Sequence, residues 1–244
     1  MVAAMADDIF AHPRLAEVYD AFDGLRDDLA AYLAIAAELG ATRVLDVGCG
    51  TGSLAALLAD HGYTVVGIDP AEASLAVARR KDPRVDWRHG DAATLPHVDA
   101  DLAVMTGNVA QVFVSDEQWS AALRGIHAAL RPGGRLVFET RRPGDRAWVG
   151  WAADTASRSM QIPGIGEVAQ RREVTEVRLP LVSFRYTYKF VDDGVELGSD
   201  STLRFRDRAE VEADLAAHGF RVLDVRDAPD RPGREYVFLA ERTD

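Results

Sequence analysis

The chain has 244 residues, and with 48% hydrophobic and 27% charged residues its composition is that of a globular protein, not of a disordered or fibrous one. The formal net charge of −11 argues against a nucleic-acid partner, and no run of Lys and Arg suggests a surface that would follow a phosphate backbone. No apolar stretch approaches the length of a membrane span, which is about 18 residues. Residues 1–10 lack the basic start of a secretory signal, and the single cysteine, Cys49, cannot form an internal disulfide. We therefore expect a cytoplasmic protein without membrane contact.

The first predicted elements are two helices within residues 14–39, where apolar positions recur with helical spacing and are interrupted at Gly24. Short β-type segments and helical segments then alternate, which is typical of βαβ units and a parallel sheet. Ser115 with Gln118 three residues later indicates a helix start of the capping-box type. The other predicted elements of this half are strand Arg43–Val47, helix Ser53–His61, strand Thr64–Ile68, helix Ala71–Arg80, strand Arg84–Arg88, strand Asp101–Met105, a turn at residues 131–134 and strand Arg135–Thr140.

The pattern changes after Arg141. Residues 182–190 alternate apolar and polar side chains with a period of two, which indicates a half-exposed antiparallel strand. The turn residues 192–194 and a returning strand through residues 203–206 complete a hairpin. We therefore expect an inserted hairpin or small antiparallel sheet over roughly residues 167–206.

The end of the chain returns to the main sheet. Asp207 with Glu210 indicates the start of a helix that ends at Gly219, and two strands follow it, Arg221–Val225 and Glu235–Ala240. The predicted fold is α/β: a Rossmann-like, seven-stranded, mostly parallel sheet with helices on both faces and an antiparallel β insertion after strand five. We expect a single domain with four parts, an N-terminal helical cover (1–42), a cofactor-binding half (43–141), an insertion or lid (142–206) and a last helix with the final strand pair (207–244).

A glycine-rich turn joins the first strand to the next helix. Gly48, Gly50 and Gly52 permit positive φ and the close approach of a ligand to the backbone. The spacing differs from the G-x-G-x-x-G of dinucleotide enzymes, because the third glycine comes one residue early and Ser53 takes its place. Asp46, two residues before the first glycine, would repel a pyrophosphate but suits a ligand that carries an amine and a sulfonium.

This turn resembles the first motif of class I S-adenosylmethionine-dependent methyltransferases, in which a hydrophobic pair and an acid precede G-x-G-x-G. Residues 44–52 match the motif throughout, and the resemblance extends over about residues 14–141 and 207–241. It implies S-adenosylmethionine as methyl donor, S-adenosylhomocysteine as product and no metal ion. The cofactor-binding residues that it implies in this turn are Asp46, Gly48, Cys49, Gly50 and Gly52.

Acids also follow the next two strands, as they do in that family. Asp69 and Pro70 end the second strand, and the resemblance implies that Asp69 binds both ribose hydroxyls. Asp91 and Ala92 follow the third strand, and Asp91 is implied to meet the adenine amine. Each acid also has a structural interpretation, because Asp69 could cap the following helix and Asp91 could hold a turn. Ligands of open α/β sheets bind beyond the carboxyl ends of the strands, so the sequence favours an adenosyl site there.

Further candidate site residues lie outside these motifs. Tyr19 is similar to a tyrosine that closes over the methionine carboxylate in many small-molecule methyltransferases, and a core position is the alternative. After the fourth strand the family places the methyl group and the acceptor, so we expect Thr106 and Asn108 beside the cofactor and Gln111 towards the acceptor. Arg141 either binds an anionic acceptor or is only solvated. We identify no general base.

The favoured function is S-adenosylmethionine-dependent N- or O-methylation of a small molecule by in-line displacement, for which alignment and removal of water can supply most of the effect. Residues 106–109 lack the N-P-P-Y pattern of many nucleic-acid methyltransferases. The alternative is an adenosyl-binding protein that does not methylate, such as an aminopropyl transferase relative or a regulatory binder. The aromatic stripe within residues 184–190 either packs on the parent domain or forms a lid over the acceptor, and neither the acceptor nor the oligomeric state can be identified from the sequence.

Overall fold

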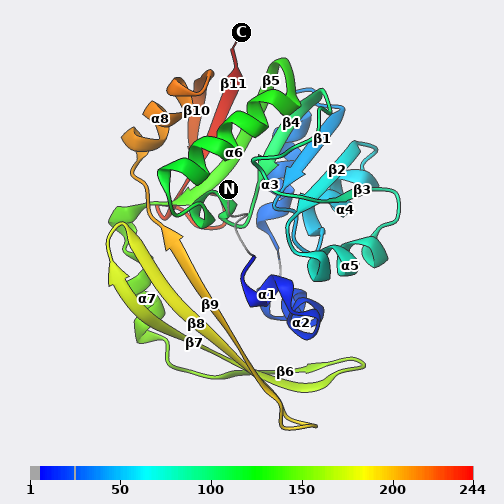
Figure 1. Ribbon diagram of the computed structural model, residues 1–244, viewed down its shortest axis with the longest axis vertical. Coiled ribbons are helices and arrows are strands. Elements are labelled where there is room, and N and C mark those ends of the chain that lie inside the picture. Colours follow the sequence, from blue (N-terminus) through cyan, green and yellow to red (C-terminus); the bar gives the residue numbers. More distant parts are fainter. Residues whose placement is uncertain (1–5, 25, 244) are drawn as a thin grey trace.

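The computed structural model describes residues 6–24 and 26–243 and is built around a seven-stranded sheet (Figure 1). The strand order is β10-β11-β5-β4-β1-β2-β3, with β11 antiparallel to both of its neighbours and the remaining pairs parallel. The predicted mostly parallel sheet, including the return of the last two strands, is therefore confirmed. The strands are β1 (Arg43–Val47), β2 (Thr64–Asp69), β3 (Asp86–His89), β4 (Ala100–Met105), β5 (Leu130–Arg141), β10 (Phe220–Asp227) and β11 (Glu235–Arg242).

The fifth strand begins earlier than the sequence predicted. β5 begins at Leu130, which pairs with Ala100 of β4, and the register then shifts so that Leu102 pairs with Arg135. The predicted turn, residues 131–134, thus lies inside the strand as an irregularity of the pairing. Turn residues at the start of a strand are compatible with such a bulge, because the chain remains extended on both sides of it.

Helices cover both faces of the main sheet. α6 (Asp116–Ala129) and α8 (Arg208–Ala217) pack on one face, and α3 (Asp28–Glu38) and α4 (Ser53–Asp60) pack on the other. Successive residues of β1 serve the two faces, as the period of a strand requires. The remaining helices are α1 (Asp8–Ala11), α2 (Pro13–Asp23), α5 (Glu72–Lys81), α7 (Ala147–Ala153) and the short 3-10 segments η1 (Val109–Val112) and η2 (Pro143–Asp145).

Both helix starts predicted from side-chain capping are present. The Ser115 hydroxyl accepts from the Gln118 amide at 3.2 Å while the Gln118 side chain accepts from the Ser115 amide at 3.1 Å. The Asp207 carboxylate accepts from the Glu210 amide at 2.9 Å. These bonds satisfy helix N–H groups that have no partner within the helix, which is why local sequence sufficed to locate them.

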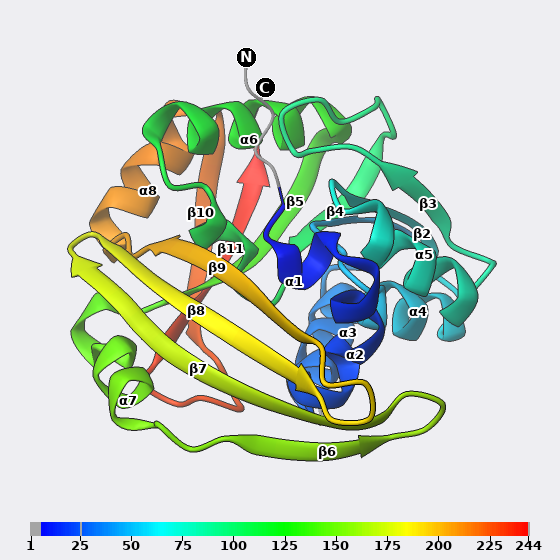
Figure 2. The same ribbon diagram turned by 60° about the horizontal axis from the view of Figure 1, so that its bottom comes forward.

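Of the two alternatives predicted for the insertion, the small antiparallel sheet is confirmed, and it begins earlier than predicted, at Arg158. It is a four-stranded antiparallel sheet, in the order β6-β7-β8-β9, that lies across the end of the main sheet (Figure 2). The predicted turn at residues 192–194 joins β8 to β9, and Gly194 has the positive φ of +72° that such a turn needs. The strands are β6 (Arg158–Ile162), β7 (Gly166–Arg178), β8 (Leu181–Phe190) and β9 (Glu196–Arg204).

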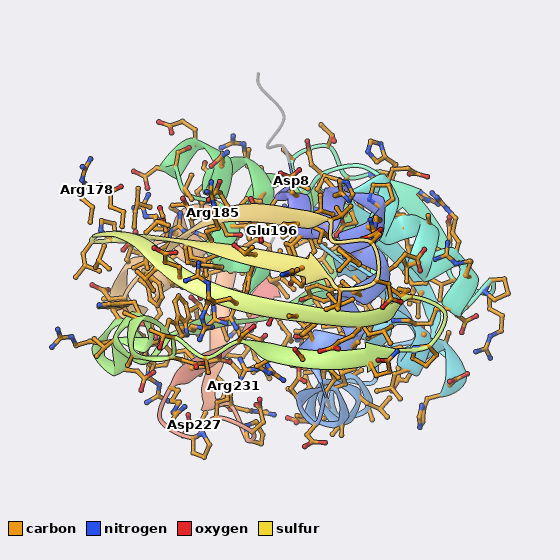
Figure 3. All side chains as sticks on the ribbon, turned by 90° about the horizontal axis from the view of Figure 1, so that it is seen from below. Asp8, Arg178, Arg185, Glu196, Asp227 and Arg231 are labelled. Carbon is orange, nitrogen blue, oxygen red and sulfur yellow. The ribbon has the colours of Figure 1, made fainter. Side chains whose placement is uncertain are left out.

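The two faces of the inserted sheet differ. Its inner face packs on the N-terminal helices, where Tyr188 and Phe190 share a buried cluster with Val18 and Phe22 of α2. The outer face carries charged side chains, including the labelled Arg185 (Figure 3), which forms an ion pair with Asp200. Tyr188 and Phe190, the last two residues of the aromatic stripe, thus pack on the parent domain.

The described residues contain no helix that is both long and apolar enough to cross a membrane. Residues 1–5, position 25 and position 244, which belong to the predicted N-terminal and C-terminal parts of the domain, lie outside the described residues.

Candidate functional site

A cavity of about 210 Å³ lies at the carboxyl ends of the central strands of the main sheet. The turns after β1, β2, β3 and β4 form its floor, and Phe10 of α1 and Thr202 of β9 also line it. In Figure 2, α1 and β9 lie next to each other in front of the main sheet. Most of the site residues proposed from the sequence line it. They are Tyr19, Asp46, Gly48, Cys49, Gly50, Asp69, Pro70, Asp91, Ala92 and Thr106.

The glycine-rich turn has no room for a side chain at Gly48, whereas Gly50 has open space around it. Gly48 has a φ of +73°, and a Cβ atom added to it would lie 2.8 Å from the side chain of Val109. The amides of Gly48 and Cys49 both donate to the carbonyl of Ile68, at 2.8 and 3.1 Å, which ties the turn to the end of β2. The turn therefore offers bare backbone to a ligand and is fixed in place by the neighbouring strand.

Asp46 is a buried carboxylate without a complete set of partners. Its side chain is 2% exposed, it lines the cavity, and its Oδ1 atom has no hydrogen-bond partner. Burial, with the nearby negative charge of Asp69, raises the pKa of Asp46 to about 7. An unpartnered buried carboxylate is costly, and a cationic ligand group would relieve that cost. The site thus fits a ligand that carries an ammonium or sulfonium group.

Asp69 and Asp91 each accept hydrogen bonds from backbone amides; those of Asp91 are of the turn type expected, whereas Asp69 bonds to the residue before α5 and does not cap that helix. Asp69 accepts from the amide of Ala71 at 2.8 Å and from the amide of Gly50 at 2.8 Å, and burial raises its pKa. Asp91 Oδ1 accepts from the amides of Ala93 and Thr94, at 2.9 and 3.0 Å. Both carboxylates also line the cavity, and each oxygen can accept a second bond, so the structural roles leave room for the ligand contacts that the sequence predicts.

Sequence reasoning missed Arg26. It lines the cavity beside Tyr19, and its guanidinium forms ion pairs with Asp23 at 3.0 Å and Asp28 at 2.7 Å. Tyr19 packs on Phe10 of α1 with ring centroids 5.2 Å apart. From the sequence alone, an arginine between two acids on adjacent helices would be interpreted as part of a surface ion pair. Nothing in the neighbouring sequence therefore indicated that Arg26 lines the site.

Two predicted cofactor residues do not line the cavity. A Cβ atom on Gly52 would lie 2.4 Å from the ring of Trp87, so this glycine is required by packing beneath the turn. Asn108 is 3% exposed, its amide group donates to Glu235 at 3.1 Å, and its backbone N–H donates to Glu139 at 3.1 Å. The cofactor-binding roles of Gly52 and Asn108 therefore stay predictions. The contacts that the structure shows for both residues are with the surrounding protein.

The two predicted acceptor residues contact one another. Arg141 donates to the side-chain carbonyl of Gln111 at 2.9 Å, and the Gln111 amide group donates to the backbone carbonyl of Arg204 at 3.2 Å. The Arg141 guanidinium lies over the ring of Trp151, 5.1 Å from its centroid. Neither side chain lines the cavity, and the pair connects the end of β5 to the inserted sheet.

Glu139 is a second buried acid near the site. Its Oε1 accepts from the amides of Gly107 and Asn108, at 2.6 and 3.1 Å, and so holds the turn after β4 on which Thr106 lies. Burial and the neighbouring Glu235 raise the pKa of Glu139 to about 7. Among the described residues, no group of three or more His, Cys, Asp and Glu side chains could hold a metal ion.

Comparison with known proteins gives consistent matches. Residues 44–134 match a family model described as a methyltransferase domain. A probable S-adenosylmethionine-dependent methyltransferase of Mycolicibacterium smegmatis is 38% identical over 111 residues, 45% of this chain and 42% of that protein. A malonyl-[acyl-carrier protein] O-methyltransferase of Serratia marcescens is 28% identical over 177 residues, 72% of this chain and 66% of that protein. The chain thus spans only part of the length of these curated relatives.

A solved structure extends the likeness to the inserted sheet. S-adenosylmethionine-bound CalS10, an amino pentose methyltransferase from Micromonospora echinaspora, is 26% identical and superimposes with a TM-score of 0.72. The match covers 93% of this chain and 97% of that one, and so includes the insertion as well as the main sheet.

Proposed function

Because the chain belongs to the class I S-adenosylmethionine-dependent methyltransferases, we propose that it transfers a methyl group from S-adenosylmethionine to nitrogen or oxygen of a small-molecule acceptor. The bound cofactor would supply an electrophilic methyl group on a positively charged sulfur. The observation that carries the proposal is Asp46, a buried carboxylate with an unpartnered oxygen in a cavity floored by Gly48 and Gly50.

The residues of the cavity suit the parts of this cofactor. Asp46 would receive the ammonium group of the methionine moiety, and Arg26 with Tyr19 would bind or cover its carboxylate. Asp69 would hold the ribose hydroxyls, and Asp91 with the adjacent backbone would meet the adenine. Each assignment uses a group that lines the cavity, and the charge of each partner is opposite where both are ionised.

The chemical demand on the remaining residues is modest. Methyl transfer requires the acceptor atom to lie in line with the bond that breaks, and it requires water to be kept away. The turn after β4, which Glu139 holds, and the part of the cavity wall on α1 and β9 would do both. Gln111 and Arg141, which connect the end of β5 to the inserted sheet, would shape the acceptor side.

One of these relatives supports a small acceptor. CalS10 is named as an amino pentose methyltransferase, whereas the Serratia marcescens relative is named as an O-methyltransferase of malonyl-[acyl-carrier protein], in which the acceptor is attached to a protein. The acidic character of the chain gives no support to a nucleic-acid acceptor.

The test is methyl transfer with labelled cofactor. Purified protein would be incubated with methyl-labelled S-adenosylmethionine and a small-molecule extract, and products would be identified by mass spectrometry. We expect a labelled small molecule with the parent chain and much less with Asp46→Asn. Binding of S-adenosylhomocysteine without any labelled product would favour the adenosyl-binding, non-methylating alternative.

A further inference from the structure

The wall of the cavity contains a carboxylate that the cofactor assignment does not use. Asp7 lines the cavity and directly precedes α1. The amide of Ile9 donates to the Ser199 hydroxyl of β9 at 2.8 Å, so the start of α1 is fixed to the inserted sheet. Thr202 of β9, three residues after Ser199, also lines the cavity. Asp7 thus belongs to the part of the cavity wall that the start of α1 and β9 form together.

The side chain of Asp7 is not used to cap its own helix. It makes no hydrogen bond to the amides of α1, although it stands at the position where such a bond commonly forms. The hydroxyl of Ser201 acts to lower its pKa, whereas the negative charges of Asp8 and Asp200 act to raise it. Burial and these two acids raise its pKa. An acid in such surroundings is stabilised by a cation.

The charges of the whole cavity lead to the same expectation. Among the described residues, four carboxylates and one guanidinium line it, and that guanidinium, on Arg26, already has two acidic partners. S-adenosylmethionine carries a net charge of +1, because its sulfonium and ammonium outweigh its carboxylate. The cavity therefore remains negative when the cofactor is bound, which disfavours an anionic acceptor and favours a cationic one.

Resting on the proposed function, we infer that the acceptor is an amine and that Asp7 binds its ammonium form and takes its proton. The amine loses one proton to the Asp7 carboxylate, and its nitrogen lone pair then forms the bond to the methyl carbon. The carbon–sulfur bond breaks with its electron pair going to sulfur, which gives the neutral thioether, and Asp7 releases the proton to water. The products are the methylated amine, S-adenosylhomocysteine and one proton.

The inference can be tested before the acceptor is identified. Sinefungin is an analogue of the cofactor in which a carbon bearing a primary amine replaces the methylsulfonium, so its ammonium lies where the acceptor approaches. S-adenosylhomocysteine lacks any charge at that place. The ratio of the two dissociation constants, measured by isothermal titration, therefore reports how favourable the acceptor side is to a cation.

The variants are Asp7→Asn and, as a matched control, Asp8→Asn. Asp8 is the exposed neighbour, labelled in Figure 3, and does not line the cavity. We expect Asp7→Asn to lose about fivefold in sinefungin affinity relative to S-adenosylhomocysteine, as for a partly exposed ion pair worth about 1 kcal/mol. Asp8→Asn should keep the ratio of the parent chain.

The outcomes separate the two proposals. An unchanged ratio in Asp7→Asn, with S-adenosylhomocysteine still bound, overturns the role of Asp7 and leaves the methyltransferase proposal intact. A fall of the same size in Asp8→Asn also overturns it, because the effect would then be that of general surface charge. Failure of the parent chain to bind S-adenosylhomocysteine would contradict the proposed function itself.

Discussion

Asp46 allows a quantitative prediction about stability and pH. Its pKa is raised from an ordinary 3.8 to about 7, so the folded chain holds its proton more tightly than the unfolded chain does. The free energy of unfolding therefore falls as pH rises from 3.8 to 7, and above pH 7 the buried charge costs about 4 kcal/mol. At pH 5 the cost is below about 2 kcal/mol, because the folded form is still protonated while the unfolded form is ionised.

The Asp46→Asn substitution removes this cost while nearly preserving shape. Without ligand, the variant should melt roughly 8 to 16 °C above the parent chain at pH 8, with less than half that difference at pH 5. Thermal unfolding of both proteins at the two pH values measures this, and comparing them at each pH cancels the parallel contribution of Glu139. The same variant should bind S-adenosylhomocysteine at least about tenfold more weakly, because the ligand ammonium loses its ionised partner. Equal melting differences at both pH values, or a less stable variant at pH 8, would refute the reasoning.

Three further predictions follow from other contacts of the site. Asp69→Ala should weaken S-adenosylhomocysteine binding at least about tenfold in titration, since it removes a carboxylate that orients the glycine turn and faces the ligand; an unchanged affinity in a folded variant would leave Asp69 only its bond to Ala71. Gly52→Val should lower the melting temperature because the new side chain would clash with Trp87 and the backbone at this position has a φ of +81°. Gly144→Val is the control, because position 144 has open space around it. Equal losses of melting temperature in the two variants would contradict the packing role of Gly52. Tyr188→Ala should destabilise the chain by about 3 to 5 kcal/mol in chemical denaturation, because it empties a fully buried site between β8 and α2; a loss below about 1 kcal/mol would mean that the inserted sheet does not support the N-terminal helices.

The parts of the fold that the sequence predicted are those with local signals. β1, with its bounds Arg43–Val47, stands between a helix end and a glycine turn, and the starts of α6 and α8 carry capping residues that bond within their own first turn. Both contacts join residues three positions apart, so a short stretch of sequence contains both partners.

The parts that were missed depend on contacts between distant residues. α1 is four residues long and has no periodic pattern, and it is held by a bond from Ile9 to Ser199 of β9. β7 has a largely exposed, charged outer face, so its alternation is weak in the sequence. Gly52 was assigned to ligand binding because of its place in the motif, while the ring that requires it belongs to Trp87 on β3. In each case the partner that decides the role is far away in the chain.

The most direct test of the central claim is isothermal titration of the purified chain with S-adenosylhomocysteine, with NAD as the comparison ligand. We predict saturable binding of one S-adenosylhomocysteine per chain and none of NAD, together with stabilisation of about 2.7 kcal/mol when the ligand is present at 100 times its dissociation constant. No binding of S-adenosylhomocysteine at millimolar concentration, or a preference for NAD, would contradict the assignment of the cavity to an adenosyl methyl donor.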